Sequence, residues 1–139
     1  MQLELVLVLQ IVFAHWVSDF VLQSGWMATN KSKNWQALLA HVATYTASMT
    51  VLMFVMAILL SDTVIKFNMI NGIILAMTPT AYMAWILLNG VLHLITDAVT
   101  SRITYKLWGR SKMHEFFVVV GFDQMIHYTC LFVTLWYMM

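Results

Sequence analysis

Four stretches of this chain are long and apolar enough to cross a lipid bilayer as helices, and this limits the folds open to it. A helix needs about 20 consecutive apolar residues to span the hydrocarbon core. Only 9% of the residues are charged and the mean hydropathy is +0.82, whereas a soluble domain has about 25% charged residues. We therefore predict an integral membrane protein, an all-α bundle of transmembrane helices forming one domain over residues 1–139. The predicted spans are 3–23, 35–60, 79–101 and 114–137.

The segments between the spans also carry local signals. Polar residues interrupt the apolar sequence within residues 62–77. Because this segment is too short to cross the membrane comfortably, we predict a short interfacial or re-entrant helix there. Thr78-Pro79 is typical of an N-cap followed by proline at the first helical position. The N-terminus lacks a basic region and a cleavage site, so the first span is expected to be retained and not removed as a signal peptide.

The charges in the loops predict which way the bundle faces. With four spans, the first and third loops lie on the same side and carry six of the 7 Lys and Arg residues. Because cytoplasmic loops are enriched in Lys and Arg, we expect both loops in the cytoplasm and both termini outside it. The predicted location of the protein is the inner membrane of a bacterium. The six are Lys31, Lys33, Arg102, Lys106, Arg110 and Lys112, against Lys66 on the other side.

Histidine and aspartate recur four residues apart in three of the predicted spans. Residues at i and i+4 share one face of a helix, so each pair presents both side chains in one direction. The second span contributes a histidine without such a partner, His41. The three pairs are His15 with Asp19, His93 with Asp97 and, in reverse order, Asp123 with His127.

The predicted spans place these seven side chains at similar depths. With a helical rise of about 1.5 Å per residue, six of them lie roughly 6–13 Å from the cytoplasmic ends of their helices, and only His127 is deeper, at about 19 Å. Interhelical hydrogen bonds, at about 0.6–2 kcal/mol each, explain any single polar residue. Each buried carboxylate, however, costs about 2.5–3.5 kcal/mol, so a purely structural role for three aspartates and four histidines is disfavoured.

The combination of imidazole and carboxylate groups indicates a site for a divalent metal ion. Helix bundles bind such ions with inward-facing histidines and carboxylates, and the absence of thiolate favours zinc, manganese or iron over copper(I). Cys130 is the single cysteine, which excludes a cysteine cluster. The predicted metal ligands are His15, Asp19, His93, Asp97, Asp123 and His127.

The candidate groups outnumber the four ligands of one tetrahedral ion. The surplus serves either a second ion or acid/base catalysis, and we predict catalytic roles for Asp19, His41 and Asp123. Asn89, one turn before His93, fits support of a ligand and helix packing equally well. The residues predicted to support the ligands or to contact substrate are Gln23, Tyr45, Asn89, Gln124, Lys31 and Arg102.

Three motifs in the chain resemble those of a family of small bacterial and phage membrane proteins catalogued as a domain of unknown function. They are His15-x-x-x-Asp19-Phe20-x-Leu22-Gln23, His93-x-x-x-Asp97 and Asp123-Gln124-x-x-His127. The likeness covers nearly the whole chain and implies no activity. In that family a lysine often follows the second motif by about one turn, whereas Ser101 and Arg102 occupy that region here. The chain is also similar, in size and intramembrane histidines and aspartates, to inner-membrane metal-dependent hydrolases.

These features favour a membrane-embedded, metal-dependent hydrolase or transferase that acts on a lipid-borne or phosphate-containing substrate at the cytoplasmic face. Two alternatives stay open. One is a proton or divalent-metal transport pathway, although the outer halves of the second and fourth spans are nearly pure hydrocarbon. The other is a phage or host factor that binds another membrane protein. No nucleic-acid partner is expected, the lipid bilayer is the expected environment, and a homo-oligomer is left open.

Overall fold

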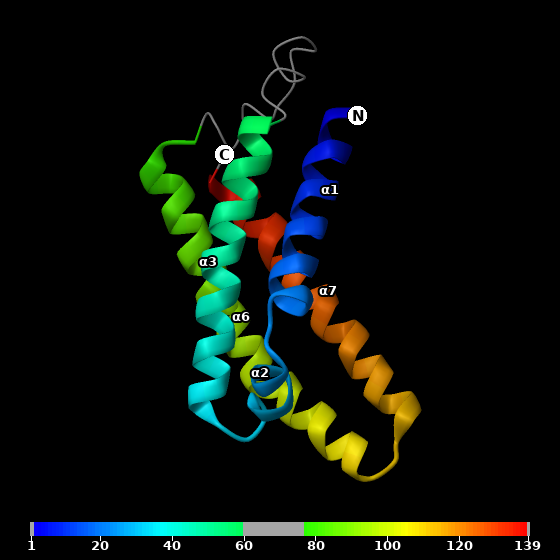
Figure 1. Cartoon of the computed structure of the whole chain (residues 1–139). Helices are drawn as coiled ribbons and strands as arrows, with labels where there is room; N and C mark the ends of the chain where they lie inside the picture. Colours follow the sequence, from blue (N-terminus) through cyan, green and yellow to red (C-terminus); the bar gives the residue numbers. More distant parts are fainter. Residues whose placement is uncertain (1, 60–76, 139) are drawn as a thin grey trace.

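The computed structural model describes residues 2–59 and 77–138, and the regular elements in that part of the chain are all helical (Figure 1). The all-α prediction is therefore confirmed for the described residues. The short helix predicted at 62–77 lies, except for Met77, outside them. In chain order the elements are α1 (Gln2–Trp16), the π-helical turn η1 (Val17–Val21), α2 (Gly25–Asn30), α3 (Trp35–Leu59), α6 (Pro79–Gly109) and α7 (Met113–Met138).

Three of the described helices, α3, α6 and α7, are long and apolar enough to cross a membrane. They correspond to the second, third and fourth predicted spans. The first predicted span, 3–23, corresponds to α1 and η1, which run without a break from Gln2 to Val21, and the apolar stretch Leu5–Val21 within them is shorter than the other three helices. After this stretch the chain turns to begin α2, whose N-cap is Ser24: the Ser24 hydroxyl accepts a hydrogen bond from the backbone N–H of Met27. The prediction of four spans is thus confirmed for three.

The start of α6 shows how the sequence sets a helix boundary. The hydroxyl of Thr78 accepts a hydrogen bond from the backbone N–H of Ala81 at 3.1 Å, and Pro79 occupies the first turn. This confirms the predicted cap. At the other end α6 continues to Gly109, beyond the predicted membrane segment, and the turn into α7 has Ser111 at a positive φ of 55°.

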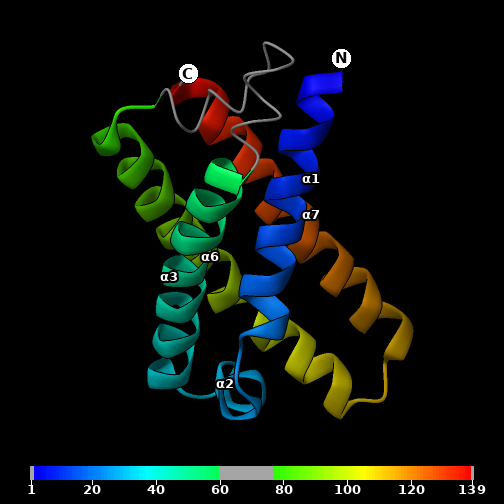
Figure 2. The ribbon, with the colours of Figure 1, turned by 45° about the horizontal axis from the view of Figure 1, so that its top comes forward.

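The helices form a bundle in which α6 packs against both α3 and α7, while α1 contacts α3 (Figures 1 and 2). Both views place the two ends of the chain at one end of the bundle, and α2 and the α6–α7 turn at the other. The approach of α3 to α6 is close at Gly90, where an added Cβ atom would lie 2.6 Å from Oγ1 of Thr46.

The interior of the bundle divides into an apolar part and a polar part. Near the chain ends the core is mainly apolar, whereas toward α2 the buried side chains include the histidines and aspartates. The outward faces of α1, α3, α6 and α7 carry large exposed apolar side chains, as expected of helices in contact with lipid. The apolar core includes Leu7, Ile11, Met49, Met53, Trp85, Ile86, Leu131 and Leu135.

Candidate metal centre

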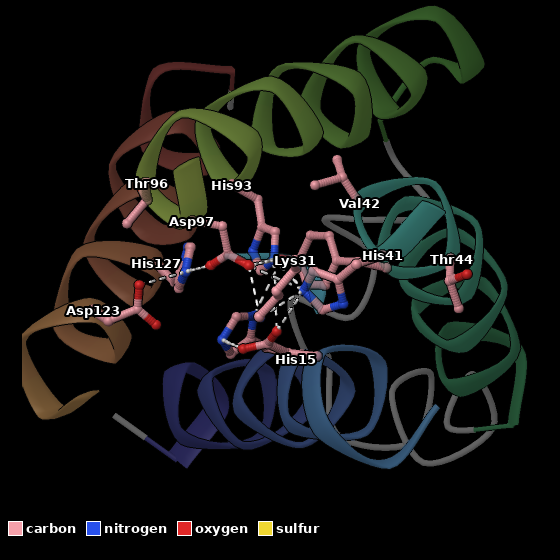
Figure 3. Close-up of polar contacts among 12 residues, drawn as sticks. His15, Lys31, His41, Val42, Thr44, His93, Thr96, Asp97, Asp123 and His127 are labelled. Carbon is pink, nitrogen blue, oxygen red and sulfur yellow. Dashed lines mark hydrogen bonds and ion pairs between the residues drawn. The ribbon is translucent and has the colours of Figure 1, made fainter. Parts of the chain in front are cut away.

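The predicted histidines and aspartates come together where α1, η1, α3, α6 and α7 converge, and Figure 3 shows most of these side chains pointing toward one another. Six of the seven are at most 3% exposed, and Asp123 is half-buried. Their ionisable groups are therefore within reach of one another and largely screened from solvent. The seven are His15, Asp19, His41, His93, Asp97, Asp123 and His127.

Four of them form a compact group, here called the four-residue set: Asp19, His41, His93 and Asp97. One nitrogen or carboxylate oxygen of each lies within 4.8 Å of those of the other three. Nε2 of His41 is 3.1 Å from Oδ1 of Asp19, 3.2 Å from Oδ2 of Asp97 and 3.1 Å from Nε2 of His93. A ring nitrogen carries at most one hydrogen, so hydrogen bonding cannot account for all three contacts.

These separations match those between the ligands of a tetrahedral ion. With metal–ligand bonds of about 2.0–2.1 Å, the ligand atoms of such an ion lie about 3.4 Å apart. The three contacts of His41 are slightly shorter, and Nε2 of His93 lies 3.6 Å from Asp19 and 3.7 Å from Asp97. A buried cluster of this geometry could hold a divalent metal ion.

A second group, the three-residue set, consists of Asp97, Asp123 and His127. Nε2 of His127 is 3.3 Å from Oδ1 of Asp97 and 3.4 Å from Oδ1 of Asp123. Asp97 thus belongs to both sets. The hydroxyl of Thr100 donates a 2.6 Å hydrogen bond to Asp123 and fixes its carboxylate.

The π-helical turn Val17–Val21 positions Asp19, and no local sequence pattern predicts this turn. Single π-helical turns are rare in proteins, and those that occur frequently lie at functional sites. Asp19 is 2% exposed, and its Oδ1 atom accepts no hydrogen bond of normal geometry even though His41 is near. This unsatisfied, buried oxygen points into the four-residue set.

His15 lies next to the two sets and outside both of them. Its Nδ1 is 3.2 Å from the hydroxyl of Tyr45 and its Nε2 is 3.1 Å from Oε1 of Gln124. The ring of Tyr45 also stacks on His93, with centroids 3.9 Å apart. The role of His15 as a ligand stays a prediction, and its contacts here are those of a residue that orients its neighbours.

The amide of Gln124 links the two sets. Its Nε2 donates to Oδ2 of Asp19 at 3.2 Å and to Oδ2 of Asp123 at 3.1 Å. Partners of this kind hold ligating carboxylates in place. The structure therefore brings Gln124 and Tyr45, both predicted as supporting residues, into contact with the cluster.

Lys31 reaches the cluster from the segment that follows α2. Its ammonium nitrogen lies 2.7 Å from Oδ2 of Asp97 and 3.2 Å from Nε2 of His41. The sequence predicts that this lysine supports the ligands or contacts substrate. The helix α2 folds back against α3, which brings Lys31 onto the buried carboxylate.

The other three predicted supporting residues differ in what they contact. Gln23 lines the cavity next to it. Asn89 does not contact it, because its amide donates to the carbonyl of Trp85 and to the hydroxyl of Thr134. The guanidinium of Arg102 donates to the carbonyl of Ala98 and lies over the ring of Trp35, 4.6 Å from its centroid.

A cavity of about 510 Å³ opens beside the cluster on the α2 side of the bundle. Its polar wall includes residues that the sequence interpretation did not place in the site, among them Lys33 and Thr100. Thr100 was detectable, because it lies three residues after Asp97 and so shares its helical face. Lys33 has no such signal. The carboxylates of Asp19, Asp97 and Asp123 and the side chain of Lys31 also line this cavity.

Fold and site together define a membrane-embedded, all-helical protein with a buried His/Asp cluster that could hold a metal ion. The chain belongs to the family described as "Protein of unknown function (DUF3307)", whose model matches residues 6–139. Membership of an uncharacterised domain family, predicted from the three motifs, is thereby confirmed. Comparison with curated proteins and with solved structures gave no match.

Proposed function

We propose that this protein is a membrane-embedded, metal-dependent hydrolase or transferase acting on a lipid-borne, phosphate-containing substrate at the cytoplasmic face. The observation that carries the proposal is that the four-residue set adjoins a cavity with cationic side chains in its wall. A divalent ion there would supply Lewis acidity and a water molecule that is acidic near neutral pH.

The cavity wall fits a substrate with an anionic head and an apolar tail. Lys31 and Lys33 contribute positive charge, and lysine is a common binder of phosphate groups. The ammonium of Lys33 lies 4.5 Å from the centroid of the Tyr105 ring and pairs with no carboxylate among the described residues. Apolar side chains complete the wall: Phe20, Trp108, Phe116 and Val120.

Hydrolysis of a phosphate ester requires two proton movements. The oxygen of water forms a bond to phosphorus while the bond between phosphorus and the ester oxygen breaks. The water loses a proton, and the departing ester oxygen takes one up. Asp123 and His127 lie beside Asp97 of the four-residue set, and two uses of this pair fit a hydrolase: carrying these protons, or binding a second ion.

The same structure disfavours the transport alternative. A transport pathway needs polar groups that continue to the opposite face of the membrane. Toward the chain ends, the described interior is filled by the apolar core, and the buried polar side chains there, Gln10 and Asn89, carry no charge.

We also propose an orientation for the bundle, from the charges at the end where the cavity opens. It opens at the end of the bundle formed by α2 and the α6–α7 turn. This end carries Lys31, Lys33, Arg110 and Lys112, and the excess of Lys and Arg marks the cytoplasmic side. We accordingly propose that the substrate enters from the cytoplasmic leaflet.

Elemental analysis of the purified protein in detergent tests the metal. We expect bound zinc, manganese or iron in the wild type and loss of that metal in Asp97→Asn, whereas Glu115→Gln, an exposed acidic residue at the start of α7, leaves it unchanged. A wild type that stays metal-free after incubation with Mn²⁺ and Zn²⁺, together with an Asp97→Asn variant of unchanged stability, contradicts the proposal.

Reconstituted vesicles test the reaction. Wild-type protein loaded with Mn²⁺ should release inorganic phosphate from vesicles of phosphatidic acid, or a headgroup from phosphatidylglycerol, and Asp97→Asn should not. A metal-loaded protein that releases neither product contradicts the hydrolase assignment. Uptake of Mn²⁺ into protein-containing liposomes, lost in Asp97→Asn, would support the transport alternative instead.

A further inference from the structure

We infer that the cluster is a two-ion centre in which the carboxylate of Asp97 bridges one ion in the four-residue set and a second ion in the three-residue set. The inference rests on the metal binding that the proposed function requires and specifies how many ions the site takes. It uses the Asp123–His127 pair as ligands and not as a proton carrier.

The two oxygens of Asp97 face different histidines. Oδ2 lies 3.2 Å from Nε2 of His41 and 3.7 Å from Nε2 of His93. Oδ1 lies 3.3 Å from Nε2 of His127. A carboxylate has two oxygens with about four lone-pair positions, so each oxygen of Asp97 can serve a different ion.

The geometry around His127 also fits an ion, because its hydrogen bond to Oδ1 of Asp97 accounts for only one of two similar contacts. Its Nε2 is nearly equidistant from Oδ1 of Asp97 and Oδ1 of Asp123, at 3.3 and 3.4 Å. A single N–H group directs its hydrogen toward one acceptor. Two similar contacts of about 3.4 Å are instead the spacing between ligands of a common ion with bonds of about 2.0–2.1 Å.

Contacts between the two sets hold them side by side. The rings of His93 and His127 stack with centroids 4.2 Å apart and an interplanar angle of 25°. The amide of Gln124 donates to Asp19 of the four-residue set and to Asp123 of the three-residue set. This arrangement fixes both groups of ligands relative to Asp97 before any ion binds.

The number of ligands distinguishes the two positions. The three-residue set supplies three ligands and leaves one tetrahedral position for water or substrate, as catalytic sites do, whereas an ion in the four-residue set has four protein ligands and takes water only as a fifth ligand. Asp97 and Asp123 line the cavity. The open position of the second ion is therefore on the side from which a substrate would enter, and paired ions suit the displacement of a phosphate ester.

Metal content and electron paramagnetic resonance of the detergent-purified protein, loaded with Mn²⁺ alone, test the inference. The wild type should bind two Mn²⁺ ions per chain and show the spectrum of a spin-coupled pair. His127→Gln and Asp123→Asn should each retain one ion and lose the coupling. His41→Gln should also lose the coupling, and Asp97→Asn should lose most bound metal. His114→Gln, an exposed histidine near the start of α7, is the matched control and should keep both ions.

Different negative results would contradict the two-ion centre, the proposed function, or both. One ion in the wild type, retained in His127→Gln and Asp123→Asn, overturns the two-ion centre and leaves a one-ion hydrolase intact. Two ions with no spin coupling overturn the bridging role of Asp97. No bound ion at all overturns both. Circular dichroism and gel filtration check that each variant folds. Because Asp123 is only half-buried, Asp123→Asn supplies the result if His127→Gln does not fold.

Discussion

The ammonium nitrogen of Lys31 lies 2.7 Å from Oδ2 of Asp97, although 66 positions separate the two residues in the chain. The carboxylate side chain is 3% exposed and the lysine side chain 18%. Lys31 is the one Lys or Arg side chain within 4.0 Å of a cluster carboxylate in the described part of the chain. It therefore offsets part of the negative charge of three aspartates.

Replacing Lys31 should destabilise the metal-free protein and increase its affinity for metal ions. In Lys31→Met we expect a loss of about 1–3 kcal/mol in the free energy of unfolding, between the values for exposed and fully buried ion pairs. Mn²⁺ affinity should rise about tenfold or more, because a cation about 4 Å away repels the ion by about 4 kcal/mol at an effective dielectric constant of 20. Thermal unfolding with and without Mn²⁺ measures both effects.

Lys33→Met is the matched control for this prediction. Lys33 lines the same cavity but contacts the Tyr105 ring and no cluster carboxylate among the described residues. It should change stability and Mn²⁺ affinity much less than Lys31→Met does. Equal effects of the two variants would mean that the direct contact with Asp97 is unimportant.

The hydroxyl of Tyr45 should contribute to stability through His15. Tyr45→Phe keeps the ring that stacks on His93 and removes the hydroxyl 3.2 Å from Nδ1 of His15. Because His15 is fully buried, its nitrogen loses its partner, and we expect a loss of about 1–3 kcal/mol in thermal unfolding. Tyr128→Phe, whose ring also contacts His15, should cost less, since the Tyr128 hydroxyl makes no described hydrogen bond.

The close approach of α3 to α6 predicts that Gly90 tolerates no larger side chain. In Gly90→Ala the new Cβ would lie 2.6 Å from Oγ1 and 3.4 Å from Cγ2 of the β-branched Thr46, and such overpacking costs about 1–3 kcal/mol. Gly121→Ala has no neighbour within 4 Å of its new Cβ and should be neutral or slightly stabilising. Adding Thr46→Ala should restore the stability of Gly90→Ala, and failure to do so would contradict this explanation.

Asn89 should matter for packing and not for metal binding. Its amide joins α6 to the hydroxyl of Thr134 in α7 at 2.8 Å, and interhelical bonds of this kind contribute about 0.6 kcal/mol on average. We expect Asn89→Leu to change stability by less than about 1 kcal/mol and to keep the wild-type metal content. Thr134→Val should have a similar effect, and the double variant should be no worse than either. Loss of bound metal in Asn89→Leu would instead support the prediction that Asn89 supports a metal ligand.

The helical fold and the polar layer could be predicted because both depend on local patterns. Apolar runs such as Trp35–Leu59 must be helical in a bilayer, where each backbone group needs an internal hydrogen-bond partner. Thr78-Pro79 marked the start of α6 for a similarly local reason. The four-residue spacing of His93 and Asp97 placed both on one helical face, and the structure turns that face inward.

Other features of the site arise from contacts between distant segments. No local sequence pattern predicts three of them: the π-helical turn at Val17–Val21, the contact of Lys31 with Asp97, and the division of the ligands into two sets. Arg102 illustrates the same limit: its position near the site suggested a role with substrate, but its guanidinium lies over Trp35.

The sequence by itself predicted that this chain forms membrane helices, and that six of the seven histidines and aspartates lie at similar depths, because helix period and bilayer thickness act on every segment independently. Only the tertiary structure decided which atoms meet. The two oxygens of Asp97 face different histidines because α3, α6 and α7 pack at particular distances and rotations. Those distances and rotations depend on the side chains of all the helices at once.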